Sequence, residues 1–360
     1  MQIRLVKKAD IGTRRQTLIF LAAIFLALFT TGLFILFLGL NPIRVYISMI
    51  NGAFGSAYRL EQTFVNAIPL IITSLGIAIA FRMKFWNIGA EGQIIMGAFF
   101  ASYVALNHSD LSRPVLLSIM FLAGFIGGAI WGFIPAFFKA KWGTNETIIT
   151  LMMNYVALKW IIYLQFGPWK DPSALGFPKI PNFAENAILP KLFGLHIGWI
   201  IALILVVLVY IFMNRSKKGF EIAVIGESIN TARYAGINIF RTIILAMVLS
   251  GGICGIVGMI QTSGVNLTLS KEITGGVGYT AIITAWLGAL KPHWIVLVSV
   301  LFAALIQGSS YIQSAFGLSA ASAQLFQAII LFFVLGSEFF ARYKVIFDWK
   351  SLSKAKEDRE

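Results

Sequence analysis

The chain has 360 residues, of which 58% are hydrophobic and only 12% are charged. A soluble domain carries about 25% charged residues, so this chain lacks the polar side chains needed to cover a surface in water. Its single cysteine excludes an intrachain disulfide and a zinc cluster built from thiolates. The apolar runs are continuous, reach about 20 residues and show no alternation of period two, which favours membrane-spanning helices over a barrel.

Ten apolar segments are expected to span the membrane. We expect a cytoplasmic N-terminus at residues 1–17, a transmembrane domain at 18–340 and a charged cytoplasmic tail at 341–360. The expected spans are approximately residues 18–40, 67–81, 85–106, 115–138, 147–166, 197–213, 242–263, 276–290, 294–312 and 321–340.

The basic residues are distributed unevenly between the two sides of this arrangement. Of the 29 Lys and Arg residues, 21 fall in segments on the side that holds both termini, 7 fall on the other side, and Lys159 lies inside the fifth span. Cytoplasmic loops carry an excess of Lys and Arg, so this bias predicts that both termini are cytoplasmic. It also accounts for the net charge of +14 without a nucleic-acid partner.

A polar stretch, Phe85–Gln93, interrupts the start of the third span. An acid inside a span usually faces the interior of the helix bundle or a wet cavity. Glu91 could hydrogen-bond a substrate, or it could accept backbone N–H groups at the broken start of its own helix. The second role is slightly favoured, because Arg82 and Lys84 place the stretch near the cytoplasmic face.

A second glycine-interrupted stretch, Gly275–Thr280, enters the eighth span, five spans later and in the opposite direction. Paired broken segments in two inverted halves point to the substrate path of a transporter, although glycine is also simply common in membrane helices. We therefore expect two inverted-repeat halves. The candidate residues of the translocation path or core gate are Asn87, Glu91, Gln93, Asn154, Gly275, Gly276, Gly278 and Thr280.

The fifth span carries Asn154 and Lys159, whose spacing of five residues does not place them on quite the same helix face. Lys159 lies in mid-span and needs either a partner or a path along which its ammonium can reach the membrane surface. Glu91, Glu146 and Glu338 are all possible partners.

The cytoplasmic loop 214–241 contains more local structure than a spacer requires. Ser228 suits a helix N-cap, Asn230–Tyr234 suits a short helix, and Gly236 would end it. The loop is either a docking element for a cytoplasmic partner or an amphipathic connector on the membrane surface. The candidate docking residues are Gly219, Glu221, Gly226, Glu227, Arg233, Tyr234 and Gly236.

Motifs of enzymes are missing from the sequence. It contains no G-x-x-x-x-G-K-[ST] phosphate loop, no G-x-S-x-G elbow, no H-E-x-x-H helix and no Cys/His metal spacing. We therefore expect no catalytic residues, no metal site and no ATPase site in this chain.

Three stretches resemble those of a known family: Trp86–Gln93, Gly219–Ile237 and Gly278–Pro292. They are similar to the membrane permease subunits of ATP-binding-cassette (ABC) importers, in the branch that takes up nucleosides and simple sugars. The resemblance extends from about residue 60 to 340. Ala223, Ser228-Ile229 and Ala281 depart from the residues common in that family, and the first two departures put the exact docking contacts in doubt.

The resemblance implies an all-helical permease in a prokaryotic cytoplasmic membrane that carries a nucleoside, with purine nucleosides favoured, or a simple sugar. Its implied partners are ABC ATPase subunits that use the ATP, a second permease subunit (a paralogue or an identical chain) and an external substrate-binding lipoprotein. The chain itself would bind no cofactor, and the loop 214–241 would be the coupling helix. The alternatives are a secondary transporter driven by an ion gradient and an ABC permease for branched-chain amino acids.

Overall fold

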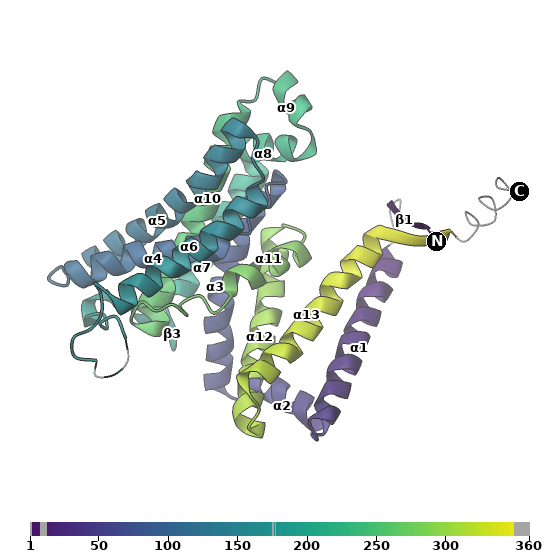
Figure 1. Cartoon of the computed structure of the whole chain (residues 1–360), viewed down its shortest axis with the longest axis horizontal. Coiled ribbons are helices and arrows are strands. Elements are labelled where there is room, and N and C mark those ends of the chain that lie inside the picture. The colour runs from purple at the N-terminus through teal and green to yellow at the C-terminus, as the bar shows by residue number, and fades with distance from the viewer. Residues whose placement is uncertain (1, 8–12, 175, 177, 349–360) are drawn as a thin grey trace, which may run out of the picture. The chain divides into compact units, whose positions relative to one another are not determined.

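The computed structural model describes residues 2–7, 13–174, 176 and 178–348, and the side chains from residue 18 to 337 except 20, 175 and 177. The chain forms two compact units, which are described separately (Figure 1). One unit runs from Ser56 to Ala304, and the other joins the segment up to Gly55 to the segment from Leu305 onward.

The larger unit, Ser56–Ala304, is built mainly from helices. Its elements are α3 (Ala57–Arg82), α4 (Ala90–Asn107), α5 (Arg113–Trp142), α6 (Glu146–Phe166), η1 (Glu185–Ala187), β2 (Lys191–Leu192), β3 (Leu195–His196), α7 (Gly198–Arg215), α8 (Lys217–Glu227), α9 (Ile229–Tyr234), α10 (Ile239–Ile260), η2 (Gln261–Asn266), α11 (Val277–Leu287) and the first half of α12 (Pro292–Phe316).

The other unit contains both ends of the chain. Its elements are β1 (Gln2–Lys7), α1 (Thr13–Phe37), α2 (Pro42–Phe54), the second half of α12, α13 (Ala320–Arg342) and β4 (Tyr343–Asp348). Strands β1 and β4 pair in antiparallel register, from Gln2 opposite Asp348 to Lys7 opposite Tyr343. The sequence did not predict this strand pair, because neither short segment has a partner nearby in the chain.

Short polar side chains set where several helices begin. The Asn145 side chain accepts hydrogen bonds from the backbone N–H groups of Thr147 and Ile148 at the start of α6. Ser228 accepts one from Thr231 N at the start of α9, which confirms the predicted cap. The predicted end of α9 is also confirmed, because Gly236 has a φ of +71°, a conformation that glycine adopts without strain.

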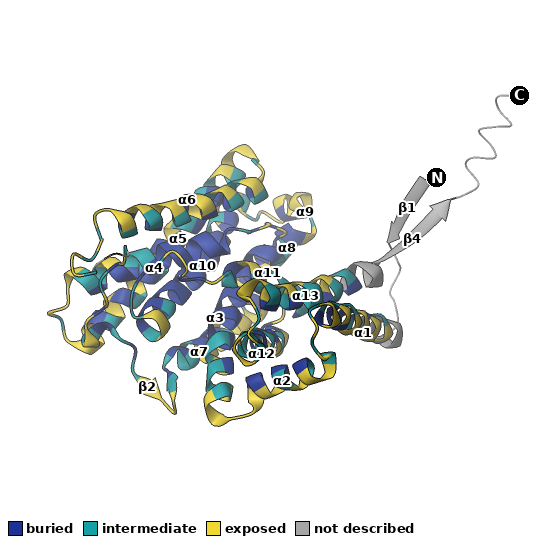
Figure 2. Ribbon diagram, turned by 60° about the horizontal axis from the view of Figure 1, so that its bottom comes forward, coloured by how far each residue is buried: buried dark blue, intermediate teal, exposed yellow. Residues whose placement is uncertain are grey.

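The core of the larger unit is formed by α3, α4 and α10, which Figure 2 shows as the darkest ribbons. Glycines bring α10 into backbone contact with α5 and α4. A Cβ atom added at Gly255 would lie 2.1 Å from Gly124 O, and one added at Gly128 would lie 2.1 Å from Gly251 O. Such contacts are typical of membrane helices, where small residues let backbones approach closely.

Among the described residues, seven helices are long and apolar enough to cross a membrane, or eight if the bent pair formed by α1 and α2 counts as one span. The chain is therefore an all-α, multi-pass membrane protein. Helices α4 and α11 lie where the third and eighth spans were expected, but α11 has only 11 residues. The count of ten spans and the inverted repeat stay predictions.

One predicted boundary is clearly wrong. The second span was expected to start near residue 67, but α3 starts at Ala57. Ser56 caps this start by accepting a hydrogen bond from Arg59 N, so the helix begins in the polar segment before the apolar run.

Candidate functional site

A cavity of about 270 Å³ lies where the first turn of α4, the middle of α6 and the start of α11 meet. Its walls are Glu91, Ile95, Asn154, Tyr155, Leu158, Lys271, Glu272, Thr274, Gly275, Gly276 and Tyr279. The two interrupted stretches singled out in the sequence are thus brought together in space, and the fifth expected span supplies the third wall.

Glu91 joins the two stretches directly. Its Oε2 accepts a hydrogen bond from Gly278 N at 2.7 Å, and its Oε1 accepts one from the Thr274 hydroxyl. The sequence reasoning expected Glu91 to bind N–H groups of its own helix, whereas the carboxylate binds the start of α11 instead. A side chain at Gly278 would exclude this contact, because a Cβ there would lie 2.5 Å from Glu91 N.

Asn154 holds α6 against the same stretch. Its Oδ1 accepts a hydrogen bond from Gly92 N at 2.8 Å, and its Nδ2 donates to Ile88 O at 2.9 Å and to the Tyr279 hydroxyl at 3.3 Å. One turn earlier, the Thr150 hydroxyl accepts from Ile88 N at 3.3 Å. Polar bonds on one side of α6 therefore fix both ends of the Ile88–Gly92 segment.

Asn87 and Gln93 lie behind the cavity wall rather than in it. Both are buried, and they exchange two amide hydrogen bonds of 3.2 Å. Asn87 also donates to the Ser250 hydroxyl of α10 at 3.3 Å and accepts from Gly89 N at 3.0 Å. This network closes the turn that precedes α4, so these two amides support the wall of the cavity from outside it.

Of the remaining candidate residues, Gly275 and Gly276 lie in the turn before α11, and Thr280 lies in α11 itself. Gly275 and Gly276 line the cavity with φ values of +54° and +80°, which glycine adopts without strain. The Thr280 hydroxyl donates to Gly276 O at 3.3 Å and does not line the cavity. The sequence reasoning missed Tyr155, Thr274 and Tyr279. The only sequence signal for them was that Thr274 and Tyr279 flank the glycine stretch.

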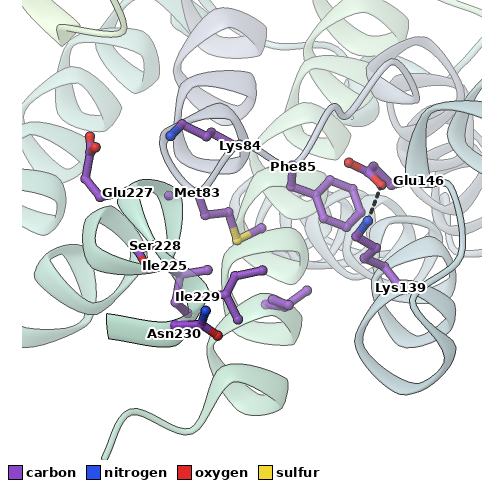
Figure 3. A pocket seen from close by; sticks show the side chains of 12 residues that line it. Met83, Lys84, Phe85, Lys139, Glu146, Ile225, Glu227, Ser228, Ile229 and Asn230 are labelled. Carbon is purple, nitrogen blue, oxygen red and sulfur yellow. Dashed lines mark ion pairs between the residues drawn. The ribbon is translucent and has the colours of Figure 1, made fainter. Parts of the chain in front are cut away.

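A second hollow, of about 360 Å³, lies on the side that the basic residues assign to the cytoplasm. We call it the basal groove. It is lined by Met83, Lys84, Phe85, Lys139, Glu146, Ile243 and the segment Ile225–Asn230 that joins α8 to α9. Figure 3 shows its apolar side chains lying between Glu227 on one side and the Lys139–Glu146 ion pair on the other.

Helix α8 is fixed tightly beside this groove. Glycine allows its approach to α3, because a Cβ at Gly226 would lie 2.1 Å from Arg82 O. The Gly219 position is equally close to Phe212 O. Both predicted docking glycines therefore act in packing α8 rather than on its free surface.

Glu221 is likewise buried and is not exposed to a docking partner. Its Oε2 accepts a hydrogen bond from Lys218 Nζ at 2.7 Å and another from the Thr242 hydroxyl of α10 at 3.2 Å. The bond from Lys218 holds the pKa of Glu221 below its usual value. This corrects its expected place among exposed contacts: Glu221 anchors α8 to α10.

The surface left free belongs to α9 and to the two ends of α8, where Phe220 is 64% exposed. Glu227 and Arg233 are exposed, Ile229 is 52% exposed and Tyr234 is 94% exposed, whereas Ala232 on the inner face of α9 is fully buried. The sequence therefore predicted this helix correctly, and the structure adds that its outer face is unoccupied by the described residues of the chain.

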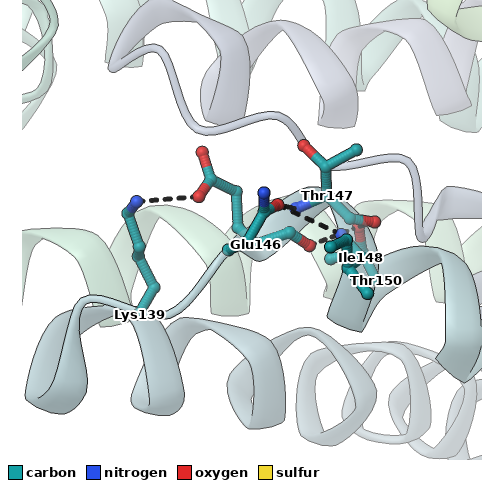
Figure 4. A network of polar contacts seen from close by, with 6 residues as sticks. Lys139, Glu146, Thr147, Ile148 and Thr150 are labelled. Atoms are coloured by element: carbon teal, nitrogen blue, oxygen red, sulfur yellow. Dashed lines mark hydrogen bonds and ion pairs between the residues drawn. The ribbon is translucent and has the colours of Figure 1, made fainter.

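An ion pair connects the ends of two helices at the basal groove. Lys139 Nζ in the last turn of α5 lies 2.8 Å from Glu146 Oε2 in the first turn of α6 (Figure 4). The Thr150 hydroxyl one turn later donates to Glu146 O at 2.8 Å. The basal groove and the polar bonds around Ile88 are therefore joined through the first turns of α6.

Comparison with known proteins assigns the chain to a family. Residues 59–335 match the family described as "Branched-chain amino acid transport system / permease component". The chain is 33% identical to a glucose ABC transporter permease protein of Haloferax volcanii, over 89% of this chain and 87% of that protein.

Two further relatives are permeases for nucleosides. The chain is 31% identical to a guanosine ABC transporter permease protein of Bacillus subtilis, over 88% of this chain and 92% of that protein. It is 30% identical to a nucleoside ABC transporter permease protein of Lactococcus lactis, over 89% and 91%. The chain therefore belongs to the branched-chain amino acid transport system permease family, as an ABC importer permease of the nucleoside and sugar branch.

Proposed function

We propose that this chain is one permease subunit of an ATP-driven importer in a prokaryotic cytoplasmic membrane. ATPase subunits dock on the outer face of α9 and on the basal groove, and an external binding protein delivers a nucleoside or a simple sugar. A second permease subunit, either a copy of this chain or a paralogue, completes the core. The chain contributes transport rather than catalysis, in keeping with its family.

The observation that carries this proposal is that α9 is held in a fixed position on the surface of the unit. The helix is only six residues long, yet Ser228 caps it, Gly236 ends it, and the buried α8 holds it in place. Its outer face presents Ile229, Arg233 and Tyr234 to water. A rigid platform that presents a cation beside two large apolar side chains suits a protein interface, in which Arg and Tyr are enriched.

The hydrogen bonds of Glu91 give less support to a transporter driven by an ion gradient. When the driving ion is the proton, such a transporter needs an acid that gains and loses a proton during transport. Glu91 is the acid that lines the cavity together with Glu272, and both of its oxygens already accept hydrogen bonds from α11 or the turn before it. Protonation would break bonds that hold the wall of the cavity together.

The first prediction tests docking at Arg233. The importer is reconstituted in liposomes with its ATPase, its partner permease and its binding protein, and ATP hydrolysis and uptake of guanosine and of glucose are measured. Arg233→Glu should reduce substrate-stimulated ATP hydrolysis at least tenfold, because charge reversal places a repulsive group at the interface. The amount of permease in the membrane should not change, since Arg233 is exposed.

The matched control is Lys291→Glu, which makes the same charge reversal at an exposed residue outside α8 and α9. It should leave stimulation intact. Normal stimulation in Arg233→Glu, or an equal loss in both variants, would count against docking at α9. Uptake that needs an ion gradient and not ATP would overturn the proposed function as a whole.

A further inference from the structure

One face of α6 exposes a mixture of side chains that a lipid-facing helix does not normally carry. Its members share the helical spacing of three and four residues: Met152, Tyr155, Val156, Lys159, Trp160 and Tyr163. We call these six residues the α6 lane. Tyr155 is 55% exposed and Tyr163 is 60% exposed, while the opposite side of the helix, with Asn154 and Ala157, is buried.

Lys159 is the charged member of the α6 lane. It lies about 20 Å along α6 from Glu146 and about 10 Å before Phe166, at 1.5 Å per residue. A charged side chain at such a depth is costly in lipid and normally faces a bundle interior or a water-filled cavity. Tyr155, one turn deeper, adds an exposed hydroxyl at the same face.

Two of the three partners considered from sequence, Glu146 and Glu91, are bound to other residues. Glu146 pairs with Lys139, and Glu91 binds α11 and the turn before it. The side chain of Glu338 lies outside the described residues. Among the described residues, the ion pairs of 4 Å or less do not include Lys159.

Helix α7 shows the contrast on the same unit. Its exposed apolar residues Leu203, Val207 and Ile211 follow one another at helical spacing with no charge among them. This is the composition expected where acyl chains cover a helix. The composition of the α6 lane is therefore the one expected beside water, and that of α7 is the one expected beside lipid.

The α6 lane leads from the loop that joins α6 to α7, which we call the outer loop, into the cavity at Glu91. Tyr155 lines both the cavity and the shallow groove that runs along Val156, Lys159, Trp160 and Tyr163. At the other end, the rings of Trp160 and Tyr163 lie 5.8 Å apart.

A further chain of ring contacts continues from the α6 lane to the outer loop. The Phe99 ring lies 5.8 Å from that of Trp160 and 5.3 Å from that of Trp169, which belongs to the outer loop. The series of rings reaches Tyr103 at 6.3 Å from Trp169. Aromatic rings thus connect the outer half of the α6 lane to the outer loop.

We propose that the α6 lane and the cavity behind it form a binding path for a nucleoside, whose flat base stacks on Tyr155 and Trp160. The Lys159 ammonium donates hydrogen bonds to the carbonyl oxygen of the base or to a ribose hydroxyl. Stacking of bases on aromatic side chains is tolerant of base identity and suits a route along which a solute moves in steps. This inference rests on the proposed function and names its substrate class.

The polar side chains that line the cavity favour a nucleoside over a hexose. Of the charged and amide side chains that line the cavity, Glu91 and Asn154 are already bound to backbone and side-chain partners, and Lys271 Nζ lies 4.0 Å from Glu272 Oε1. The many hydroxyls of a sugar would lose water without gaining enough partners, which is costly. A base requires mainly flat apolar surface and a few donors, and the α6 lane offers both.

The first test measures whether water reaches the α6 lane. Cys254 is the single native cysteine and is fully buried, so the native chain is a suitable background for introduced cysteines. Val156→Cys is compared with Val207→Cys on α7, because the two valines are 56% and 55% exposed. A membrane-impermeant, negatively charged thiol reagent is added to the assembled importer.

We expect Val156→Cys and Lys159→Cys to react at least tenfold faster than Val207→Cys, and guanosine to slow the reaction of Val156→Cys. Equal, slow reaction at residues 156 and 207 would show that lipid or another subunit covers the α6 lane, and this would overturn the proposal. Fast reaction that glucose slows and guanosine does not would overturn the assignment to nucleosides.

The second test measures stacking through uptake. Tyr155→Leu should lower guanosine uptake at subsaturating concentration about tenfold, whereas Tyr155→Phe, which keeps the ring, should retain most of it. Tyr210→Leu on α7, where Tyr210 is 42% exposed, is the control and should have no effect. Copurification of the ATPase with each variant reports whether the complex is assembled.

The outcomes separate this inference from the proposed function. If Tyr155→Leu transports guanosine normally while Arg233→Glu still loses stimulated ATP hydrolysis, the α6 lane is wrong and the ATP-driven permease stands. If uptake does not depend on ATP at all, the proposed function fails, whichever solute the α6 lane accepts.

Discussion

His196, the last residue of β3, has 3% of its surface exposed, and neither ring nitrogen has a hydrogen-bond partner among the described residues. Glycines let the backbone close over it, because a Cβ at Gly198 would lie 2.6 Å from His196 Nδ1 and one at Gly264 would lie 3.0 Å from its Cγ. Burial lowers the pKa of His196 to about 4, and the nearby charge of Lys191 adds to the effect.

This histidine should make the stability of the outer loop depend on pH. The unfolded chain binds a proton near pH 6.5, whereas the folded chain does so only near pH 4, so acidification through this interval favours unfolding. At pH 5 the loss relative to pH 7.5 should be about 2 kcal/mol. Thermal unfolding of the purified protein at the two pH values measures it.

The variant His196→Gln supplies the control for this prediction. It cannot gain a charge, so its melting temperature should change less between pH 7.5 and pH 5 than that of the native chain. If both proteins lose the same stability on acidification, the effect arises from other groups, and the buried histidine is not its source.

The partner of Glu91 could not be predicted from the sequence around it. The sequence predicted that this acid would accept backbone N–H groups at the start of its own helix, whereas the N–H group that donates to it is that of Gly278 in α11. The sequence could not predict that the donor lies 187 positions away, since nothing in the local pattern of either stretch specifies its partner. Tyr155 and Tyr279 were missed for the same reason: each lines the cavity only because α6 and α11 meet there.

At the scale of elements, the signals for α9 were local and therefore sufficient. A serine cap and a glycine with positive φ act within a few residues of the helix they bound. The sequence of α8 predicts a helix less clearly, because glycines such as Gly219 and Gly226 disfavour the interior of a helix. Only the close approach to Phe212 O and Arg82 O explains why those glycines lie inside a helix.

The first turns of α6 should transmit movement from the basal groove to the cavity. Lys139 and Glu146 join α5 to α6, and Thr150 and Asn154 join α6 to the segment Ile88–Gly92. Lys139→Glu or Glu146→Lys alone should therefore reduce the number of substrate molecules carried per ATP. We expect an effect of about 1 kcal/mol, or roughly fivefold, because the Lys139 side chain is 34% exposed.

A charge exchange distinguishes this link from a general loss of packing. The double variant Lys139→Glu with Glu146→Lys restores an ion pair in the opposite sense and should recover most of the transport per ATP. A double variant as impaired as the worse single variant would show that the pair does not act as a link.

At the scale of the whole molecule, the paired strands β1 and β4 constrain the topology. Two strands that share backbone hydrogen bonds lie in the same compartment, so we predict from this pairing that both ends of the chain lie on one side of the membrane. The predicted number of crossings is then even, as in the eight spans counted with the bent pair or the ten expected from the sequence. The bias of Lys and Arg predicts that this side is the cytoplasm.

Reporter fusions test this prediction. A fluorescent protein that folds only in the cytoplasm and a phosphatase that is active only outside it are attached to each end in turn. Both ends should give fluorescence without phosphatase activity. Fluorescence at one end and phosphatase activity at the other would require an odd number of crossings and would contradict the pairing of β1 with β4.

The glycine contacts between α5 and α10 also bear on the ion gradients that a membrane hosting an importer must maintain. A file of water molecules needs a space of about 10–15 Å³ at each step, and protons could follow such a file. At Gly124, Gly128, Gly251 and Gly255 the two backbones touch, so no such space separates the helices there. These four glycines therefore leave no room for a file of water molecules between α5 and α10 along this stretch.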